Sequence, residues 1–105
     1  MLNAHIVGWG EYLPNRIVTN AELAQTIGMD ADWVKTRTGI EQRHIADPKQ
    51  ASADMATRAA RAALANADIS PSQLGLIIVA TSTPDYLFPA TACLVHNALG
   101  ADNAG

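Results

Sequence analysis

The sequence predicts an α/β fold in which helices flank a mainly parallel sheet. Predicted strands and helices follow one another in the order β-α-α-β-α-β-α, which is typical of α/β proteins. The clearest strand, 74–81, is apolar on both faces, as are strands in the middle of a helix-covered parallel sheet. Such a strand needs neighbours on both sides, and the chain supplies few. We therefore expect residues 1–105 to form one part of a larger α/β domain.

The first predicted elements are a strand and a short helix. Residues 4–10 place His-Ile-Val among small residues and predict a short strand. Thr19, followed three residues later by Glu22, matches the capping-box pattern that begins a helix, here over 21–27. Gly28 ends this helix, because glycine readily adopts the left-handed conformation found after helix C-termini.

A second short helix follows the first. Asp30 is the expected N-cap, and Gly39 is expected to end the helix. Trp33 and Arg37 lie four residues apart on this helix, so their side chains share a face. The next stretch, 39–46, has an alternating pattern that predicts an exposed strand or hairpin arm.

An alanine-rich helix is predicted to follow Ser52 and to run to about Ala67. Ser52 is its expected N-cap, and Asp54 in its first turn complements the helix dipole. The small residues of one face allow neighbouring segments to approach closely. That face carries Met55, Ala59, Ala62, Ala63 and Ala67.

The remaining elements surround the predicted strand 74–81. Ser70 followed by Pro71 is a second helix-start signal, since proline favours the first helical position. Residues 82–88 are expected to form a loop. Pro89 is expected to begin a last helix, which ends near Gly100.

Composition excludes several classes of protein. Of the 105 residues, 49% are apolar and only 16% are charged, a balance opposite to that of a disordered chain. The net charge of −3 and the lack of any Lys/Arg cluster argue against nucleic-acid binding. No run reaches the roughly 18 apolar residues that span a membrane. A single cysteine cannot form an internal disulfide, so we expect a cytoplasmic protein.

Cys93 is the most reactive side chain by type, and His96 follows it closely. A catalytic thiolate usually lies at a helix N-terminus or a strand-helix elbow. The pattern places Cys93 about one turn into an alanine-rich helix, where free cysteine usually acts as a small apolar filler. We expect this structural role for it.

Metal and dinucleotide sites are not predicted. The three histidines have no metal-binding spacing; they are His5, His44 and His96. The Gly8-Trp9-Gly10 stretch lacks the third glycine and the following helix of a dinucleotide-binding turn.

Three side chains are better candidates for binding. The Trp33 ring and the Arg37 guanidinium on one helix face could hold a flat heterocycle by stacking and cation–π attraction. The alternative is that Trp33 belongs to the core and Arg37 packs over it. Phe88 lies in a loop and either fills a pocket, its own or a partner's, or is buried beside the last helix.

The chain resembles a known enzyme family at five places. Trp33 to Arg43 reads Trp-Val-Lys-Thr-Arg-Thr-Gly-Ile-Glu-Gln-Arg, and Gly10-x-Tyr12-Leu13-Pro14 precedes it. Further matches are Thr19-Asn20-Ala21-Glu22-Leu23, residues 76–82, and Phe88-Pro89-Ala90-Thr91-Ala92-Cys93. Together these resemble the N-terminal portion of β-ketoacyl-acyl-carrier-protein synthase III, over the whole length of the chain.

The resemblance implies an incomplete N-terminal half of a thiolase-like fold, that is, a partial N-terminal domain over 1–105, in a homodimeric enzyme. Such enzymes move an acyl group from acyl-CoA, their substrate, onto a cysteine. They then condense it with malonyl acyl carrier protein, losing CO₂, to initiate fatty-acid synthesis without a separate cofactor. By position, Trp33 and Arg37 would hold the CoA adenine, with Thr38 assisting. Phe88 would reach across the dimer into the partner's acyl pocket and limit chain length.

The same resemblance places no catalytic residue in this chain. The nucleophilic cysteine of the family lies beyond the part that residues 1–105 match, its histidine and asparagine partners lie in the second half, and Cys93 matches a non-catalytic cysteine. We therefore expect residues 1–105 alone to lack condensing activity. Product formed from acyl-CoA by the purified 105-residue chain would contradict this.

Two alternatives remain open from the sequence. One is a related acyltransferase of the same framework that esterifies or amidates a small molecule. The other is a non-catalytic module that binds CoA or dimerises.

Overall fold

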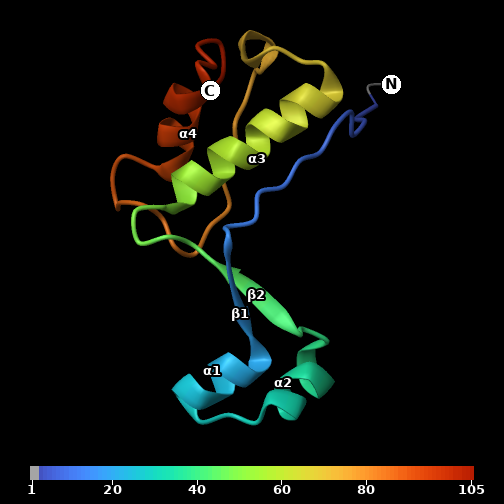
Figure 1. Cartoon of the computed structure of the whole chain (residues 1–105). Helices are drawn as coiled ribbons and strands as arrows, with labels where there is room; N and C mark the ends of the chain where they lie inside the picture. The colour runs from blue at the N-terminus through green and yellow to red at the C-terminus, as the bar shows by residue number, and fades with distance from the viewer. Residues whose placement is uncertain (1–2) are drawn as a thin grey trace. The chain divides into compact units, whose positions relative to one another are not determined.

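The computed structural model describes residues 3–105, which form two compact units (Figure 1). Unit 1 comprises residues 3–12 and 50–105, and unit 2 comprises Leu13–Lys49. The elements of unit 2 are β1 (Arg16–Thr19), α1 (Asn20–Ile27), α2 (Ala31–Thr38) and β2 (Gln42–Ile45). Those of unit 1 are α3 (Ser52–Ala67), the short 3-10 helix η1 (Pro71–Gln73) and α4 (Thr91–Leu99).

Unit 2 is a two-stranded sheet whose strands are joined by two helices. β1 and β2 are antiparallel, with Arg16 opposite Ile45 and Thr19 opposite Gln42. β2 lies within the stretch predicted as a strand or hairpin arm. β1 was not predicted, although its Arg-Ile-Val-Thr sequence contains the β-branched residues that favour strands. The buried side chains of Val18 and Val34 anchor the strand and α2 in the small core of this unit.

The helix ends of unit 2 form as predicted. Thr19 Oγ1 accepts a hydrogen bond from the Glu22 amide at 3.2 Å, and Gly28 ends α1 in the left-handed conformation. Asp30 Oδ1 accepts from the Asp32 amide at 3.0 Å at the start of α2. Gly39 ends α2 with φ +70°. Local sequence signals therefore determine both helices.

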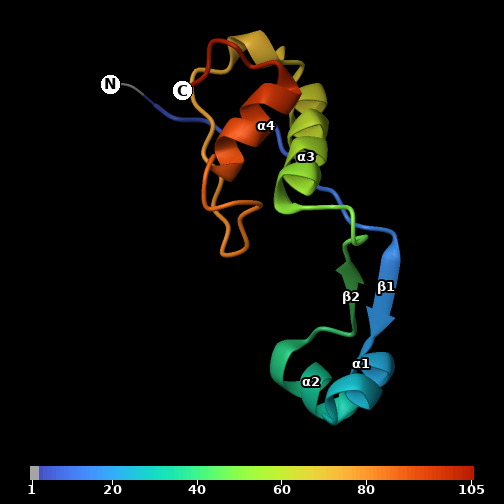
Figure 2. The same cartoon turned by 90° about the vertical axis from the view of Figure 1, so that its left-hand side faces the viewer.

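In unit 1, α3 and α4 pack against each other, as the view in Figure 2 shows. Val95 of α4 and Ala53 of α3 are buried. The Arg61 guanidinium of α3 donates to the Ala98 carbonyl at 2.8 Å, which places a positive charge at the C-terminus of α4, where it is favourable.

The N-terminal segment lies directly against the small residues of α3. A Cβ atom added at Gly10 would lie 2.3 Å from the Ala63 nitrogen, and one at Gly8 would lie 2.6 Å from the Ala67 Cβ. The predicted close-approach face of α3 is therefore occupied. The strand predicted over 4–10 is wrong, because this segment contacts a helix rather than a strand.

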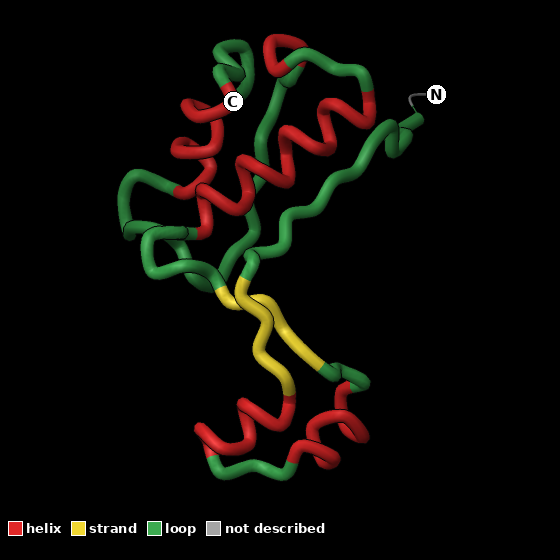
Figure 3. Tube along the Cα trace, in the orientation of Figure 1, coloured by secondary structure: helices red, strands yellow, loops and turns green. Residues whose placement is uncertain are grey.

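Residues 74–81 are extended but do not belong to a sheet among residues 3–105 (Figure 3). Gly105 donates to the Gly75 carbonyl at 3.1 Å, and Ile77 donates to the Gly105 carbonyl at 3.0 Å. This is the hydrogen-bond pattern of parallel strands, begun at a single residue. The sheet that the structure describes within residues 3–105 is antiparallel and lies in unit 2, so the mainly parallel sheet that the sequence predicts is not formed among these residues.

Only one side of this extended segment is covered. Ile77 and Val79 are half-buried, whereas Leu76 and Ile78 are 64% and 81% exposed. The expectation that both faces are covered is therefore not met within residues 3–105, where α3 and α4 are the helices of this unit.

Two predicted helix starts need correction. Ser52 is the first residue of α3 rather than its cap, because its hydroxyl donates to the Thr83 carbonyl at 2.6 Å. α4 begins at Thr91, two residues after Pro89. None of the helices in residues 3–105 has the length and apolar character needed to span a lipid bilayer.

Candidate functional site

The first candidate site is the exposed face of α2. The Trp33 side chain is 49% exposed, so the alternative of a core tryptophan is not what the structure shows. The guanidinium carbon of Arg37 lies 6.0 Å from the centre of the Trp33 ring, which is within the range of a cation–π contact. The neighbouring Val34 is buried and holds the helix on its unit. Val34 of α2 thus packs into unit 2, whereas Trp33 and Arg37 are exposed to solvent.

The spacing of this pair bears on what it could hold. A planar ring inserted between two groups needs about 7 Å, twice the carbon contact distance of roughly 3.5 Å. The observed 6.0 Å from the guanidinium carbon to the ring centre is longer than direct stacking contact and shorter than the space that an inserted ring needs. Arg37 is exposed and its side chain is long and flexible, so its guanidinium can move outward on ligand binding.

Thr38 has a structural role at the end of α2. Its hydroxyl donates to the Val34 carbonyl at 2.6 Å and accepts from the Ile40 amide at 3.1 Å. A hydroxyl has one hydrogen to donate and two lone pairs, so Thr38 keeps one acceptor position for a ligand N–H. Its role in binding stays a prediction.

A polar pair of the buried Asn20 and the half-buried Arg43, which sequence reasoning missed, fixes the segment after α2. The Asn20 side-chain amide donates to the Ile40 carbonyl at 2.7 Å, and its oxygen accepts from Arg43 at 2.7 Å. Arg43 also donates to the Val18 carbonyl at 3.2 Å. Asn20 is only 8% exposed, so losing either partner would leave polar atoms unsatisfied. Only the pairing of β1 with β2 brings these residues together, which is why the sequence alone gives no signal.

An exposed ion pair lies on a different face of α2, because Lys35 is two residues from both Trp33 and Arg37 and residues two apart do not share a helix face. Lys35 Nζ is 2.6 Å from Glu41 Oε1. The hydrogen bond and the charge of Glu41 raise the pKa of Lys35, and Lys35 likewise lowers the pKa of Glu41. Lys35 and Arg37 are the basic residues at the end of α2. Lys35 pairs with Glu41, whereas Arg37 lies over the ring of Trp33.

The second candidate site is the loop that carries Phe88, in unit 1. Phe88 is 90% exposed and Leu87 is fully exposed, so the alternative of burial beside α4 is wrong. Tyr86 and Leu87 line a hollow of about 280 Å³ together with Val79 and Thr81. This loop presents an apolar tip to its surroundings.

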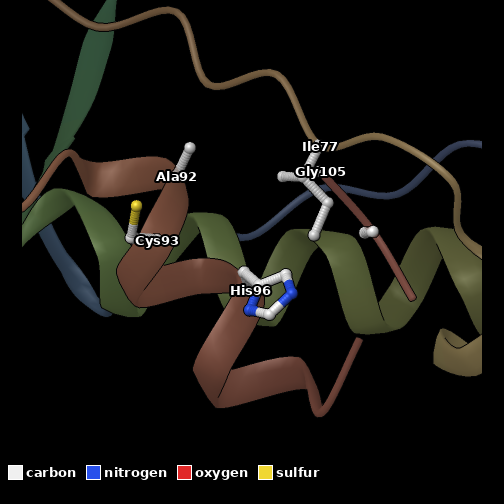
Figure 4. Close-up of a pocket in the computed structure, with 6 residues that line it drawn as sticks. Ile77, Ala92, Cys93, His96 and Gly105 are labelled. Carbon is white, nitrogen blue, oxygen red and sulfur yellow. The ribbon is translucent and has the colours of Figure 1, made fainter. Parts of the chain in front are cut away.

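Cys93 and His96 line a separate apolar pocket of about 240 Å³, drawn in Figure 4. Cys93 is exposed and lies in the first turn of α4, so the expectation of a buried filler within the helix is wrong. The sulfur and the imidazole do not point toward each other in Figure 4. No three histidine, cysteine, aspartate or glutamate side chains of residues 3–105 gather closely enough to hold a metal ion.

Comparisons with known proteins define the class of this fold. No family model matches the chain. The 3-oxoacyl-[acyl-carrier-protein] synthase III of Aquifex aeolicus VF5 superposes on 94% of this chain with a TM-score of 0.86 and 45% identity, and the match covers 32% of that chain. The priming β-ketosynthase of the R1128 polyketide pathway superposes on 95% with a TM-score of 0.88 and 38% identity, covering 30% of its own chain. The fold is therefore that of part of a thiolase-like condensing enzyme.

Sequence similarity identifies the particular relatives. The β-ketoacyl-[acyl-carrier-protein] synthase III of Caldanaerobacter subterraneus subsp. tengcongensis is 52% identical over 101 residues, which are 96% of this chain and 30% of that protein. This confirms the resemblance: the chain is homologous to a part of β-ketoacyl-acyl-carrier-protein synthase III. It spans about 30% of the length of the curated relatives that it matches.

Proposed function

We propose that this chain is the N-terminal, CoA-recognising portion of a β-ketoacyl-acyl-carrier-protein synthase III-type acyltransferase. In this function, acyl-CoA is the substrate and no separate cofactor is needed. The enzyme would transfer the acyl group to a cysteine outside these residues and condense it with malonyl acyl carrier protein, in the cytoplasm. The observation that carries the proposal is the exposed Trp33–Arg37 pair within the segment that matches the synthases.

Each candidate residue has a distinct role in this proposal. Trp33 stacks on one face of the CoA adenine and Arg37 covers the other face, while Thr38 accepts a hydrogen bond. Arg37 also has the geometry to pair with a phosphate group. Phe88, on its exposed loop, enters the acyl pocket of a second subunit and limits the length of the acyl chain.

Titration with CoA tests the adenine contact. Base-aromatic stacking is worth about 1–3 kcal/mol, so we expect Trp33→Ala to weaken CoA binding at least about fivefold. Trp9 is a second exposed tryptophan, in unit 1, and Trp9→Ala serves as the matched control. In the Trp9→Phe protein, Trp33 is the only indole left, so quenching of its fluorescence reports stacking directly.

The control ligand is pantetheine, which lacks the adenine nucleotide. We expect it to leave the fluorescence of Trp33 unchanged. CoA affinity that is equal in the Trp33→Ala and Trp9→Ala proteins would overturn the role of Trp33. If the parent chain binds no CoA at all, the non-catalytic CoA-binding module is excluded for these residues alone.

A second function is favoured by one observation. The polyketide priming ketosynthase superposes as well as the synthase III of Aquifex aeolicus does, so the framework is not restricted to one reaction, and an acyltransferase of the same framework that acts on a small molecule is the alternative. Assays of the intact protein with malonyl acyl carrier protein and with small-molecule acceptors separate the two. Acyl transfer to a small molecule only would replace the fatty-acid function.

A further inference from the structure

A carboxylate that the sequence did not single out connects the Phe88 loop to the helices of unit 1. Asp85 lies three residues before Phe88. Its two carboxylate oxygens accept hydrogen bonds from the Ala53 amide in the first turn of α3, at 2.9 and 3.3 Å. The Thr91 hydroxyl, at the start of α4, donates to Asp85 Oδ1 at 3.2 Å. The Asp85 amide donates back to the same hydroxyl at 3.3 Å.

This arrangement supplies what the start of α3 lacks. The N-cap residue, Ala51, has no side-chain group to accept from the first amides of the helix, and such amides need acceptors. Asp54 accepts from the Ala51 amide at 2.9 Å, and Asp85 serves the Ala53 amide. A carboxylate at this position is also favoured by the helix dipole. Asp85 is therefore a cap contributed from 32 residues away.

Hydrogen bonds hold the loop near Thr83 and Asp85, whereas its tip, Leu87 and Phe88, is exposed. Besides Asp85, the Ser52 hydroxyl donates to the Thr83 carbonyl at 2.6 Å, while Thr91 is 96% buried. Between these fixed points, Leu87 and Phe88 are 101% and 90% exposed. Nothing within the described chain covers the Phe88 ring, so its position depends on how the base of the loop is held.

We propose that Asp85 is the positioning residue for Phe88, and that it sets the acyl-chain selectivity through the place it gives to that ring. This rests on the proposed function, in which Phe88 limits the acyl pocket. Asp85 itself touches no substrate. It acts by joining the loop to the N-termini of α3 and α4.

The first test does not depend on any activity. Hydrogen exchange is measured in the 105-residue chain with Asp85→Ala and, as the matched control, Asp54→Ala. Both variants remove a carboxylate that accepts a backbone hydrogen bond at the start of α3. Only Asp85 belongs to the Phe88 loop and also bonds to Thr91. We expect Asp85→Ala to speed exchange about tenfold at the Ala53 and Asp85 amides. Equal exchange of the residue-85 amide in both variants would show that the Asp85 carboxylate does not hold the loop in place.

The second test measures selectivity in the intact protein produced from its natural gene. The ratio of kcat/KM for a short and a long acyl-CoA is compared for Asp85→Ala, Phe88→Ala and the double variant. We expect each single variant to shift this ratio about tenfold. We also expect the double variant to match Phe88→Ala, because Asp85 acts through Phe88. Additive shifts would show that Asp85 acts in another way.

Asp85→Asn separates positioning from loss of folding. Asparagine keeps an acceptor oxygen for the Ala53 amide, so it should restore most of the selectivity. If it does not, although the protein is folded and active, the hydrogen bond is not what positions Phe88. If the intact protein transfers no acyl group, the proposed function fails. Hydrogen exchange still shows whether Asp85 holds the loop to the starts of α3 and α4.

Discussion

The half-exposed side chain of Trp33 is the main support for a binding site in unit 2. Fully burying a large apolar side chain stabilises a protein by roughly 1.5–3 kcal/mol, and Trp33 leaves 49% of its surface in water. The neighbouring Val34 is buried instead. This division was foreseen only in part: the helical spacing put Trp33 and Arg37 on one face, but the sequence left open whether that face was core or surface.

The Lys35–Glu41 pair predicts a pH dependence of unit 2. Its hydrogen bond lowers the pKa of Glu41 below the ordinary 4.5 and raises that of Lys35 above 10.5. The contribution of Glu41 is therefore present above pH 4.5 and lost as the pH falls through its folded-state pKa. That of Lys35 is present below pH 10.5 and lost as the pH rises through its folded-state pKa.

Both groups are exposed, so the effect is small and is screened by salt. We expect Glu41→Gln to flatten the acid limb of the unfolding free energy of unit 2 at low ionic strength, measured by urea titration. Glu11→Gln changes another exposed carboxylate, in unit 1, and is the control. An acid limb that is unchanged by Glu41→Gln would show that the pair does not contribute.

Among the elements, α3 has its start and one face held by segments that are distant in sequence. Its alanine face was predicted from spacing, and the structure places the backbone of Gly8 and Gly10 against it. Its N-terminus could not be predicted, because the Asp85 carboxylate that caps it is remote in sequence. The caps of α1 and α2 were predicted, since Thr19, Asp30 and Gly39 act within a few residues.

Gly10→Ala should destabilise unit 1. The added Cβ would lie 2.3 Å from the Ala63 nitrogen and 2.5 Å from the Ala59 carbonyl oxygen, so the segment or the helix backbone must move. Overpacking of this kind costs about 1–3 kcal/mol, and backbone atoms favour the upper end. Urea unfolding measures the difference in free energy.

Gly75→Ala is the matched control for that experiment. Gly75 also lies in an extended segment of unit 1, but a Cβ there would meet nothing within 4 Å. We expect it to change the unfolding free energy by less than about 1 kcal/mol. Equal losses in the two variants would show that the close contact with α3 is not the cause.

The extended segment 74–81 shows what a sequence pattern can and cannot give. Its apolar residues predicted an extended conformation that belongs to a parallel arrangement, and Gly105 begins parallel pairing with it. Whether such a segment becomes a strand depends on hydrogen-bonding partners, which are not encoded in the segment itself. The antiparallel β1 was missed for the related reason that its partner, β2, is remote in sequence.

For the molecule as a whole, unit 1 leaves large apolar side chains uncovered. Ile6, Ile78, Leu87 and Phe88 are each more than 80% exposed, and no large side chain among residues 3–105 is more than 98% buried. Extended exposed apolar segments favour association. We expect the isolated 105-residue chain to self-associate with increasing concentration, as sedimentation equilibrium would show.

Substitution of the exposed side of one segment tests this. Leu76→Thr with Ile78→Thr keeps a β-branched, extended segment while removing apolar surface, and should weaken the association. Ile27→Thr, at a half-exposed isoleucine of unit 2, is the control. A parent chain that stays monomeric at all concentrations would contradict the expectation.

The interruption of unit 1 by unit 2 has a consequence for the order of folding. Trp9 bonds to Asn66 across 57 residues of sequence, and Tyr12 bonds to Gln50 at the two points where the chain leaves and re-enters unit 1. Closing a long loop costs more conformational entropy than closing a short one, and distant contacts slow folding. The β1–β2 pairing of unit 2 closes a shorter stretch of chain than the Trp9–Asn66 contact does, so unit 2 can form first and bring Tyr12 and Gln50 together. The N-terminal segment then reaches α3 through a much shorter effective loop. Substitutions that disrupt the β1–β2 pairing of unit 2 would therefore delay the folding of unit 1.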